Sequence, residues 1–163
     1  MHNDLKYKIG ITLIDGIGDI TAKKLIAYCG GVEAVFLEKK SALLKIPDVG
    51  RTAANAVVTQ SVLSKAEKEI EFIRKRNINP LFYLDDDYPQ RLKYCDDSPV
   101  MLYCAGNMDL NRKRIVSIVG TRSATAHGKK LCEDLVAQLK HNNVSIISGL
   151  AYGIDITAHK AAV

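Results

Sequence analysis

The chain has 163 residues, a formal net charge of +5 and an apolar fraction of 47%. This length accommodates one domain or two small ones, and the composition is that of an ordinary globular core, which excludes a disordered chain. The mild positive charge fits a polyanionic partner without requiring one. Because the sequence has no signal-like apolar core and no apolar run of about 18 residues, we expect a cytoplasmic protein with no membrane partner.

The first 29 residues predict two helices around a glycine-containing hairpin. Apolar residues at helical spacing run through residues 4–13, Asp15-Gly16-Ile17-Gly18 interrupts them, and residues 21–29 predict a second helix with Leu25 and Ile26 facing inward. This pattern is typical of a helix–hairpin–helix motif, whose glycines expose backbone N–H groups to a DNA phosphate. The candidates for a secondary DNA contact are Gly16, Gly18, Lys23 and Lys24.

Residues 32–77 indicate a second copy of this motif. Short helices are predicted over residues 32–37 and 41–46, a second hairpin at Pro47-Asp48-Val49-Gly50, and one long helix from Thr52 to about Asn77. Asp48 stands where a phosphate-binding hairpin often has Gly, so a structural or protein-contact module is the alternative to DNA binding. Either reading predicts a small all-α domain.

The next stretch predicts strands over residues 80–84 and 100–104, the second of them in the same sheet as the strand that follows. Asp85-Asp86-Asp87 is interpreted as a solvated turn, because consecutive residues rarely aim three carboxylates at one ion. The four cysteines are scattered without a C-x-x-C pair, so we expect free thiols in a reducing compartment, no metal site and no cofactor.

Residues 114–159 predict a βαβα unit. Two short apolar strands, residues 115–119 and 144–147, each lead into a glycine-containing turn and a helix. The first helix begins near Thr125 and carries an apolar face of Leu131, Leu135 and Leu139, with Val136 beside them. The second helix covers residues 153–162. The predicted fold class is α/β, with a parallel Rossmann-like sheet preceded by the small all-α domain.

Both turns lie at the carboxyl ends of their strands, where sheets of this kind bind ligands. Gly120, Gly149 and Gly153 permit close approach of a ligand to backbone, and the Arg122 guanidinium suits a phosphate. The pattern predicts a phosphate-binding pocket between the two turns; the alternative is ordinary turn glycines and a solvated arginine. No catalytic residue is predicted, since Asp155 is expected to stabilise the first turn of its own helix and His159 to pack locally.

The segments Ser117-Ile118-Val119-Gly120-Thr121-Arg122, Ser148-Gly149-Leu150-Ala151-Tyr152-Gly153-Ile154-Asp155 and Ala158-His159 together resemble the DNA-processing protein A (DprA/Smf) family. Tyr88-Pro89-Gln90-Arg91-Leu92 and the residues from Ser98 to Gly106 resemble the segment that precedes this motif in the family. The resemblance implies a bacterial cytosolic protein without established catalytic activity. Such a protein binds single-stranded DNA, protects incoming DNA and helps to load RecA recombinase in natural transformation.

The resemblance also implies a helix–hairpin–helix or SAM-like domain, here residues 1–77, and a Rossmann-like domain of which residues 78–163 would be the truncated N-terminal part. The full-length family is expected to form homodimers, and an open sheet edge predicts a marginal or self-associating second domain. Resemblance and geometry together select these nucleic-acid-binding residues: Gly120, Thr121, Arg122, Lys129, Ser148, Gly149, Leu150, Ala151 and Gly153.

Two other functions remain open from the sequence. Rossmann-like relatives with similar glycine turns hydrolyse nucleoside monophosphates, but they need a catalytic carboxylate and a later PGGxGT-type loop, neither of which occurs in residues 1–163. A helix–hairpin–helix DNA-repair accessory is the other alternative. The two independent family-like segments in residues 80–163 argue against it.

Overall fold

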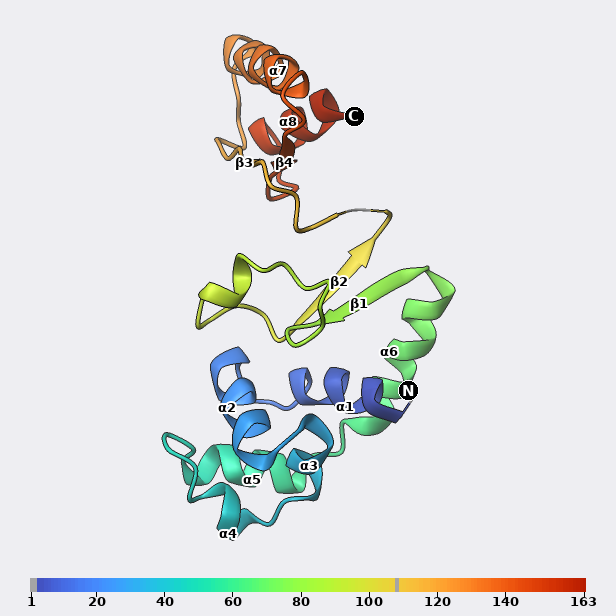
Figure 1. Ribbon diagram of the computed structural model, residues 1–163, viewed down its shortest axis with the longest axis vertical. Helices are drawn as coiled ribbons and strands as arrows, with labels where there is room; N and C mark the ends of the chain where they lie inside the picture. Colours follow the sequence, from blue (N-terminus) through green and yellow to red (C-terminus); the bar gives the residue numbers. More distant parts are fainter. Residues whose placement is uncertain (1–2, 108) are drawn as a thin grey trace. The chain divides into compact units, whose positions relative to one another are not determined.

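The computed structural model describes residues 3–107 and 109–163 and divides into two units, Met1–Asn111 and Arg112–Val163. Each unit is described by itself, with its elements labelled as in Figure 1. The helices of the first unit are α1 (Asn3–Thr12), α2 (Asp19–Cys29), α3 (Val32–Leu37), α4 (Lys40–Leu43), α5 (Arg51–Thr59) and α6 (Leu63–Lys75). These helices enclose an apolar core, whose fully buried members include Ile9, Ile11, Leu25, Val35, Leu43 and Val57.

The single long helix predicted from Thr52 to Asn77 is wrong, because the structure has α5 and α6 in its place. The chain leaves the helix at Gln60, whose backbone is extended at φ −62° and ψ 151°. The Gln60 side chain then accepts a hydrogen bond of 2.9 Å from the Val62 N–H, which forms a turn. The break lets three residues enter the same core: Val57 on α5, Val62 just before α6, and Ala66 on α6.

The strands β1 (Ile78–Phe82) and β2 (Met101–Ala105) form an antiparallel pair in the first unit, with Ile78 opposite Ala105 and Phe82 opposite Met101. The prediction that residues 100–104 join the parallel sheet is therefore wrong. Phe82, Val100 and Met101 are buried in the core that the helices form. Because of this shared core, the first unit extends to Asn111, whereas the domain boundary expected from the sequence lay between residues 77 and 78.

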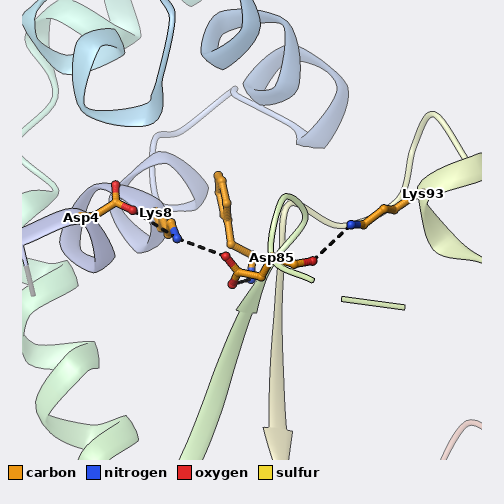
Figure 2. Close-up of polar contacts among 5 residues, drawn as sticks. Asp4, Lys8, Asp85 and Lys93 are labelled. Atoms are coloured by element: carbon orange, nitrogen blue, oxygen red, sulfur yellow. Dashed lines mark hydrogen bonds and ion pairs between the residues drawn. The ribbon is translucent and has the colours of Figure 1, made fainter. Parts of the chain in front are cut away.

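Polar contacts fix the connection between the two strands. The Asp85 carboxylate accepts hydrogen bonds from the Phe82 N–H at 2.7 Å and from the Lys8 Nζ at 3.3 Å, while the Asp85 carbonyl accepts from Lys93 (Figure 2). Lys8 also pairs with Asp4 one turn earlier on α1. Asp85 is thus a structural residue that joins the turn after β1 to helix α1.

Tyr88 is the largest of the fully buried side chains, and its hydroxyl donates a 2.6 Å hydrogen bond to the Pro99 carbonyl. Burial raises the pKa of this phenol. Asp19, at the start of α2, accepts a 2.7 Å hydrogen bond from the Val100 N–H. The residues that resembled the family's lead-in segment therefore close the connection between β1 and β2 against the helices.

The second unit contains β3 (Ile115–Ser117), α7 (Ala126–Lys140), β4 (Ser145–Ile147) and α8 (Ile154–Ala162). The strands are parallel, with Ile115 opposite Ser145 and Ser117 opposite Ile147, so the predicted βαβα unit is confirmed. The Thr125 hydroxyl caps α7 by accepting a 3.1 Å hydrogen bond from the Gly128 N–H. The chain is therefore an α/β protein with a Rossmann-like parallel pair.

Only part of the predicted apolar face of α7 is covered. Cys132 and Val136 are buried with Ile118 and Ala158, whereas Leu131 and Leu135 are 57% and 48% exposed. Each large apolar side chain contributes about 1.5–3 kcal/mol when it is fully buried. Because few such side chains are buried in this unit, its turns depend more on polar bonds than the helical core of the first unit does.

None of the helices formed by the described residues combines the length and the apolar character that crossing a bilayer requires.

The contacts of Lys8 give a stability prediction. Burial tends to lower the pKa of Lys8, but hydrogen bonds to Asp4 and Asp85 and their negative charges outweigh it and raise the pKa above 10.5. We expect Lys8→Met to lower the free energy of unfolding by about 1 kcal/mol, the upper end for partly exposed ion pairs. Because the folded-state pKa is raised, this loss should be constant from neutral pH up to the unfolded-state pKa and disappear as the pH rises through the folded-state pKa.

Urea denaturation of the wild type and the variant over a pH series measures this difference. Lys65→Met, on the exposed side of α6, is the control and should leave stability unchanged at every pH. A Lys8→Met variant as stable as the wild type at neutral pH would contradict the structural role of this ion pair.

Candidate nucleic-acid interface

The two turns named from the sequence lie side by side because they follow paired parallel strands. The Ile118 N–H donates a 2.9 Å hydrogen bond to the Ile147 carbonyl, which continues the pairing past both strand ends. The Ser148 hydroxyl returns a 2.5 Å hydrogen bond to the Ile118 carbonyl. The structure thus brings residues 120–122 and 148–153 to one edge of the strand pair.

A buried carboxylate joins these two turns. Asp155, only 6% exposed, accepts a hydrogen bond from the Gly120 N–H at 3.3 Å and one from the Gly149 N–H at 3.2 Å, through different oxygens. This differs from the expected stabilisation of its own helix, since the bonds reach the neighbouring turns. In the turns where the sequence predicted a phosphate-binding pocket, these two N–H groups are therefore bound to the protein's own carboxylate.

His159 lies one turn beyond Asp155 on α8. Its Nε2 is buried and has no hydrogen-bond partner among the described residues. The Nε2 atom of His159 therefore makes no hydrogen bond to the Asp155 carboxylate.

The glycines of the turns are required by protein packing. A Cβ at Gly120 would lie 2.7 Å from the Ile154 Cβ, and one at Gly153 would lie 2.1 Å from the Thr121 carbonyl oxygen. Gly153 also has φ +85°, a conformation that strongly favours glycine. The sequence attributed these glycines to close approach of a ligand, whereas in the structure they let the first turn and α8 approach each other.

A hollow of about 690 Å³ lies beside the two turns. Cationic side chains come to it from the first turn (Arg122), from α7 (Lys129) and from α8 (Lys160), against one carboxylate, Glu133. All three cations are exposed. In the part of the chain that the structure describes, none of the three forms a hydrogen bond or ion pair through its side chain, so each remains available to an anionic ligand.

The remaining lining combines polar and apolar groups: Ser123, Ala124, Tyr152, Gly153, Ile156, Thr157 and Ala161. The volume lies within the range of about 300–1,000 Å³ that small-ligand pockets occupy. The hollow is therefore large enough for a nucleotide unit, with an excess of positive charge.

Apart from Leu150, the predicted site residues fall into two groups. Arg122, Lys129 and Gly153 line the hollow. The others serve the turns themselves: Gly120 and Gly149 bind Asp155, Ser148 binds the Ile118 carbonyl, the Thr121 carbonyl accepts from the Ile154 N–H, and the Ala151 carbonyl accepts from the Ile156 N–H. Leu150 is 79% exposed with φ +36° and is absent from the described lining of the hollow.

Sequence reasoning missed Tyr152 and Lys160, both of which line the hollow. Tyr152 lies between two residues that the sequence did select, Ala151 and Gly153. Lys160 follows Gly153 by two helical turns, a spacing that places both on one face of a helix. That spacing was the available signal for Lys160, and an aromatic residue within a glycine-containing turn was the signal for Tyr152.

The first unit places the secondary candidates differently. Gly16 and Gly18 are exposed, and nothing lies within 4 Å of a Cβ built at either. Lys23 donates hydrogen bonds to the Asp96 carbonyl and the Ser98 hydroxyl. Lys24 forms an ion pair with Asp48, and this hydrogen bond and charge lower the pKa of the Asp48 carboxyl. The two glycines are thus open to a ligand, whereas both lysines have partners within the unit.

Cysteine chemistry makes no visible contribution to the site. All four cysteines are free, and burial raises the pKa of Cys29, Cys104 and Cys132. No group of three or more metal-ligating side chains gathers within residues 3–107 and 109–163.

The second unit is a Rossmann-like α/β module whose cationic hollow lies at the carboxyl ends of its parallel strands. Residues 79–163 match the family described as DNA recombination-mediator protein A. The chain therefore belongs to this family, and the resemblance noted from the sequence is confirmed.

Known relatives extend the match. A DNA processing protein DprA of Streptococcus pneumoniae (strain ATCC BAA-255 / R6) is 44% identical over 79 residues, 48% of this chain and 28% of that protein. A DNA processing protein DprA of Bacillus subtilis (strain 168) is 36% identical over 100 residues, 61% of this chain and 34% of that protein. The chain thus spans about a third, or less, of the length of these relatives.

The X-ray structure of DNA processing protein A (DprA) from Streptococcus pneumoniae superposes with a TM-score of 0.73 at 27% identity. The superposition covers 96% of this chain and 53% of that one. Nearly the whole chain therefore has a counterpart in a solved structure.

The packing of the turns predicts which glycines tolerate a methyl group. We expect Gly153→Ala to destabilise the second unit by about 3 kcal/mol or more, because the new Cβ would overlap the Thr121 carbonyl in a strained backbone conformation. Gly128→Ala is the control, since its Cβ would meet the Thr125 hydroxyl at an ordinary 3.4 Å.

Amide hydrogen exchange followed by mass spectrometry measures both variants. Gly153→Ala should raise exchange across residues 115–163, whereas Gly128→Ala should leave it unchanged or lower it. Equal protection in the two variants would contradict the tight packing of Gly153 against the first turn.

Proposed function

We propose that this chain is part of a single-stranded DNA-binding protein of the DNA-processing type and that the hollow beside the two turns is its DNA site. Three cations from three separate elements, Arg122, Lys129 and Lys160, carry the proposal. A strand crossing the hollow would exchange counterions for these side chains, which is the main source of affinity in non-specific DNA binding. Membership of a recombination-mediator family supports DNA as the polyanion.

The proposal gives these residues different tasks. Arg122 binds a phosphate through its guanidinium fork, and Lys129 and Lys160 supply further charge. The turns that hold Arg122 in place are shaped by the other predicted residues: Gly120, Thr121, Ser148, Gly149, Leu150, Ala151 and Gly153. The Asp155 carboxylate accepts two backbone hydrogen bonds in this arrangement, which is a structural role and needs no catalytic step.

In the cell, the proposed protein protects incoming single-stranded DNA and loads RecA recombinase during natural transformation, acting as a homodimer when full-length. The family and its DNA-processing relatives support this part of the proposal. The proposal assigns residues 1–77 to a helix–hairpin–helix or SAM-like domain. It assigns residues 78–163 to the N-terminal part of the Rossmann-like DNA-binding domain, of which Phe82, Val100 and Met101 pack into the core of the first unit.

The first unit enters the proposal only through the backbone of one hairpin. Gly16 and Gly18 have open space beside them, which suits a secondary contact with a DNA phosphate. Lys23 and Lys24 would have to leave their partners Ser98 and Asp48 to take part.

Neighbouring lysines on α7 provide a matched test of the main site. Lys129 lines the hollow, whereas Lys130 is ion-paired with Asp134. We expect Lys129→Ala and Arg122→Ala each to weaken binding of a labelled oligo(dT) and to make the slope of log K against log salt less steep by about 0.7 per lost phosphate contact. Lys130→Ala should bind like the wild type.

Fluorescence anisotropy over a salt series, with a duplex of the same length as comparison, measures these effects. The wild type should prefer the single strand. If Lys129→Ala and Lys130→Ala weaken binding equally, the hollow is not the DNA site. If duplex binds better than oligo(dT) and Arg122→Ala has no effect, the hairpin of the first unit carries the binding instead.

A further inference from the structure

An aromatic side chain lies beside the cations of the hollow. Tyr152 is 84% exposed and lines the hollow together with Arg122 and Lys129. Burying an aromatic ring removes a large apolar surface from water, so a ring left this exposed has unused contact area. The combination of a free ring and nearby cations matches the two parts of a nucleotide, the flat base and the phosphate.

The backbone around Tyr152 is held on both sides even though the ring is exposed. Before it, the Gly149 N–H is bound to Asp155, and the Ala151 carbonyl accepts a 3.1 Å hydrogen bond from the Ile156 N–H. After it, Gly153 packs against the backbone of Thr121 and Arg122. A ring attached to a fixed backbone loses little further freedom when it binds, which favours a contact role.

The walls near the ring suit a base rather than a bare anion. Ile156 and Ala161 contribute apolar surface to the hollow, and Thr157 and Ser123 contribute polar atoms. A free phosphate would need only the cations. The hollow thus offers a mixed surface, and its volume lies within the range of small-ligand pockets.

We propose that Tyr152 is a stacking platform for one unpaired nucleobase of the DNA strand whose phosphates Arg122, Lys129 and Lys160 bind. This inference rests on the proposed function and adds that the site recognises an unpaired base of the DNA strand. A base inside a duplex is already stacked on its neighbours and is not available to the ring, whereas a base of a single strand is. Tyr152 therefore supplies the preference for single strands that the cations alone do not provide.

The test compares a fluorescein-labelled oligo(dT) with an abasic strand of the same length, which keeps the sugars and phosphates but has no bases. The wild-type chain should bind oligo(dT) about tenfold more tightly than the abasic strand, within the range that base–aromatic stacking supplies. Tyr152→Phe keeps the ring and should retain this preference. Tyr152→Leu should bind both strands equally, with the affinity of the wild type for the abasic strand.

Tyr94 provides a matched control, because it is 89% exposed in the first unit and lies outside the hollow. Tyr94→Leu should behave like the wild type towards both strands. Since Tyr152 is mostly exposed, its variants should keep the wild-type thermal melt, which circular dichroism checks.

The outcomes separate this inference from the function on which it rests. If the wild type binds both strands equally, or if Tyr152→Leu keeps a preference for oligo(dT), stacking on Tyr152 is excluded. If in that case Arg122→Ala still weakens binding of the abasic strand, the DNA site in the hollow stands without a base platform. If the wild type binds neither strand, both proposals fail.

Discussion

The bridge that Asp155 makes between two backbone turns is the constraint on which the second unit depends. One buried carboxylate accepts N–H groups from the turn after β3 and from the turn after β4. A buried carboxylate without donors would be strongly unfavourable, and so would two buried N–H groups without acceptors. The turns and the start of α8 therefore form one polar unit, in a part of the chain where the apolar core is small.

This arrangement determines how the site can act. Because the turn N–H groups face Asp155, the protein's own anion occupies the place that a phosphate would take in a dinucleotide-binding turn. The groups left for a ligand are side chains, namely Arg122, Lys129, Tyr152 and Lys160 around the hollow. Separate side chains can follow a flexible strand, whereas a narrow N–H cradle suits one fixed phosphate. This difference connects the fold to the proposed binding of a DNA strand.

The sequence predicted the order of elements well where local pattern decides it. The βαβα unit, the inward Leu25 and Ile26 and the family follow from periodicity, glycines and motif residues. It failed where distant contacts decide: the break at Gln60 depends on a side-chain bond, and β2 joins β1 through a shared helical core. The sequence identified both glycine turns of the site. It gave no sign that the carboxylate of Asp155, five residues after Leu150, joins the two turns.

Chemical-shift mapping of the ¹⁵N-labelled chain with oligo(dT) tests the central claim most directly, because it reports on the turn amides and on the hollow in one experiment. The account predicts that the side-chain signals of Arg122 and the amides around Lys129, Tyr152 and Lys160 shift most, while the Gly120 and Gly149 amides keep their hydrogen bonds to Asp155 and move little. Largest shifts at Gly120 and Gly149 would contradict it, since the phosphate would then have displaced Asp155 from the turns.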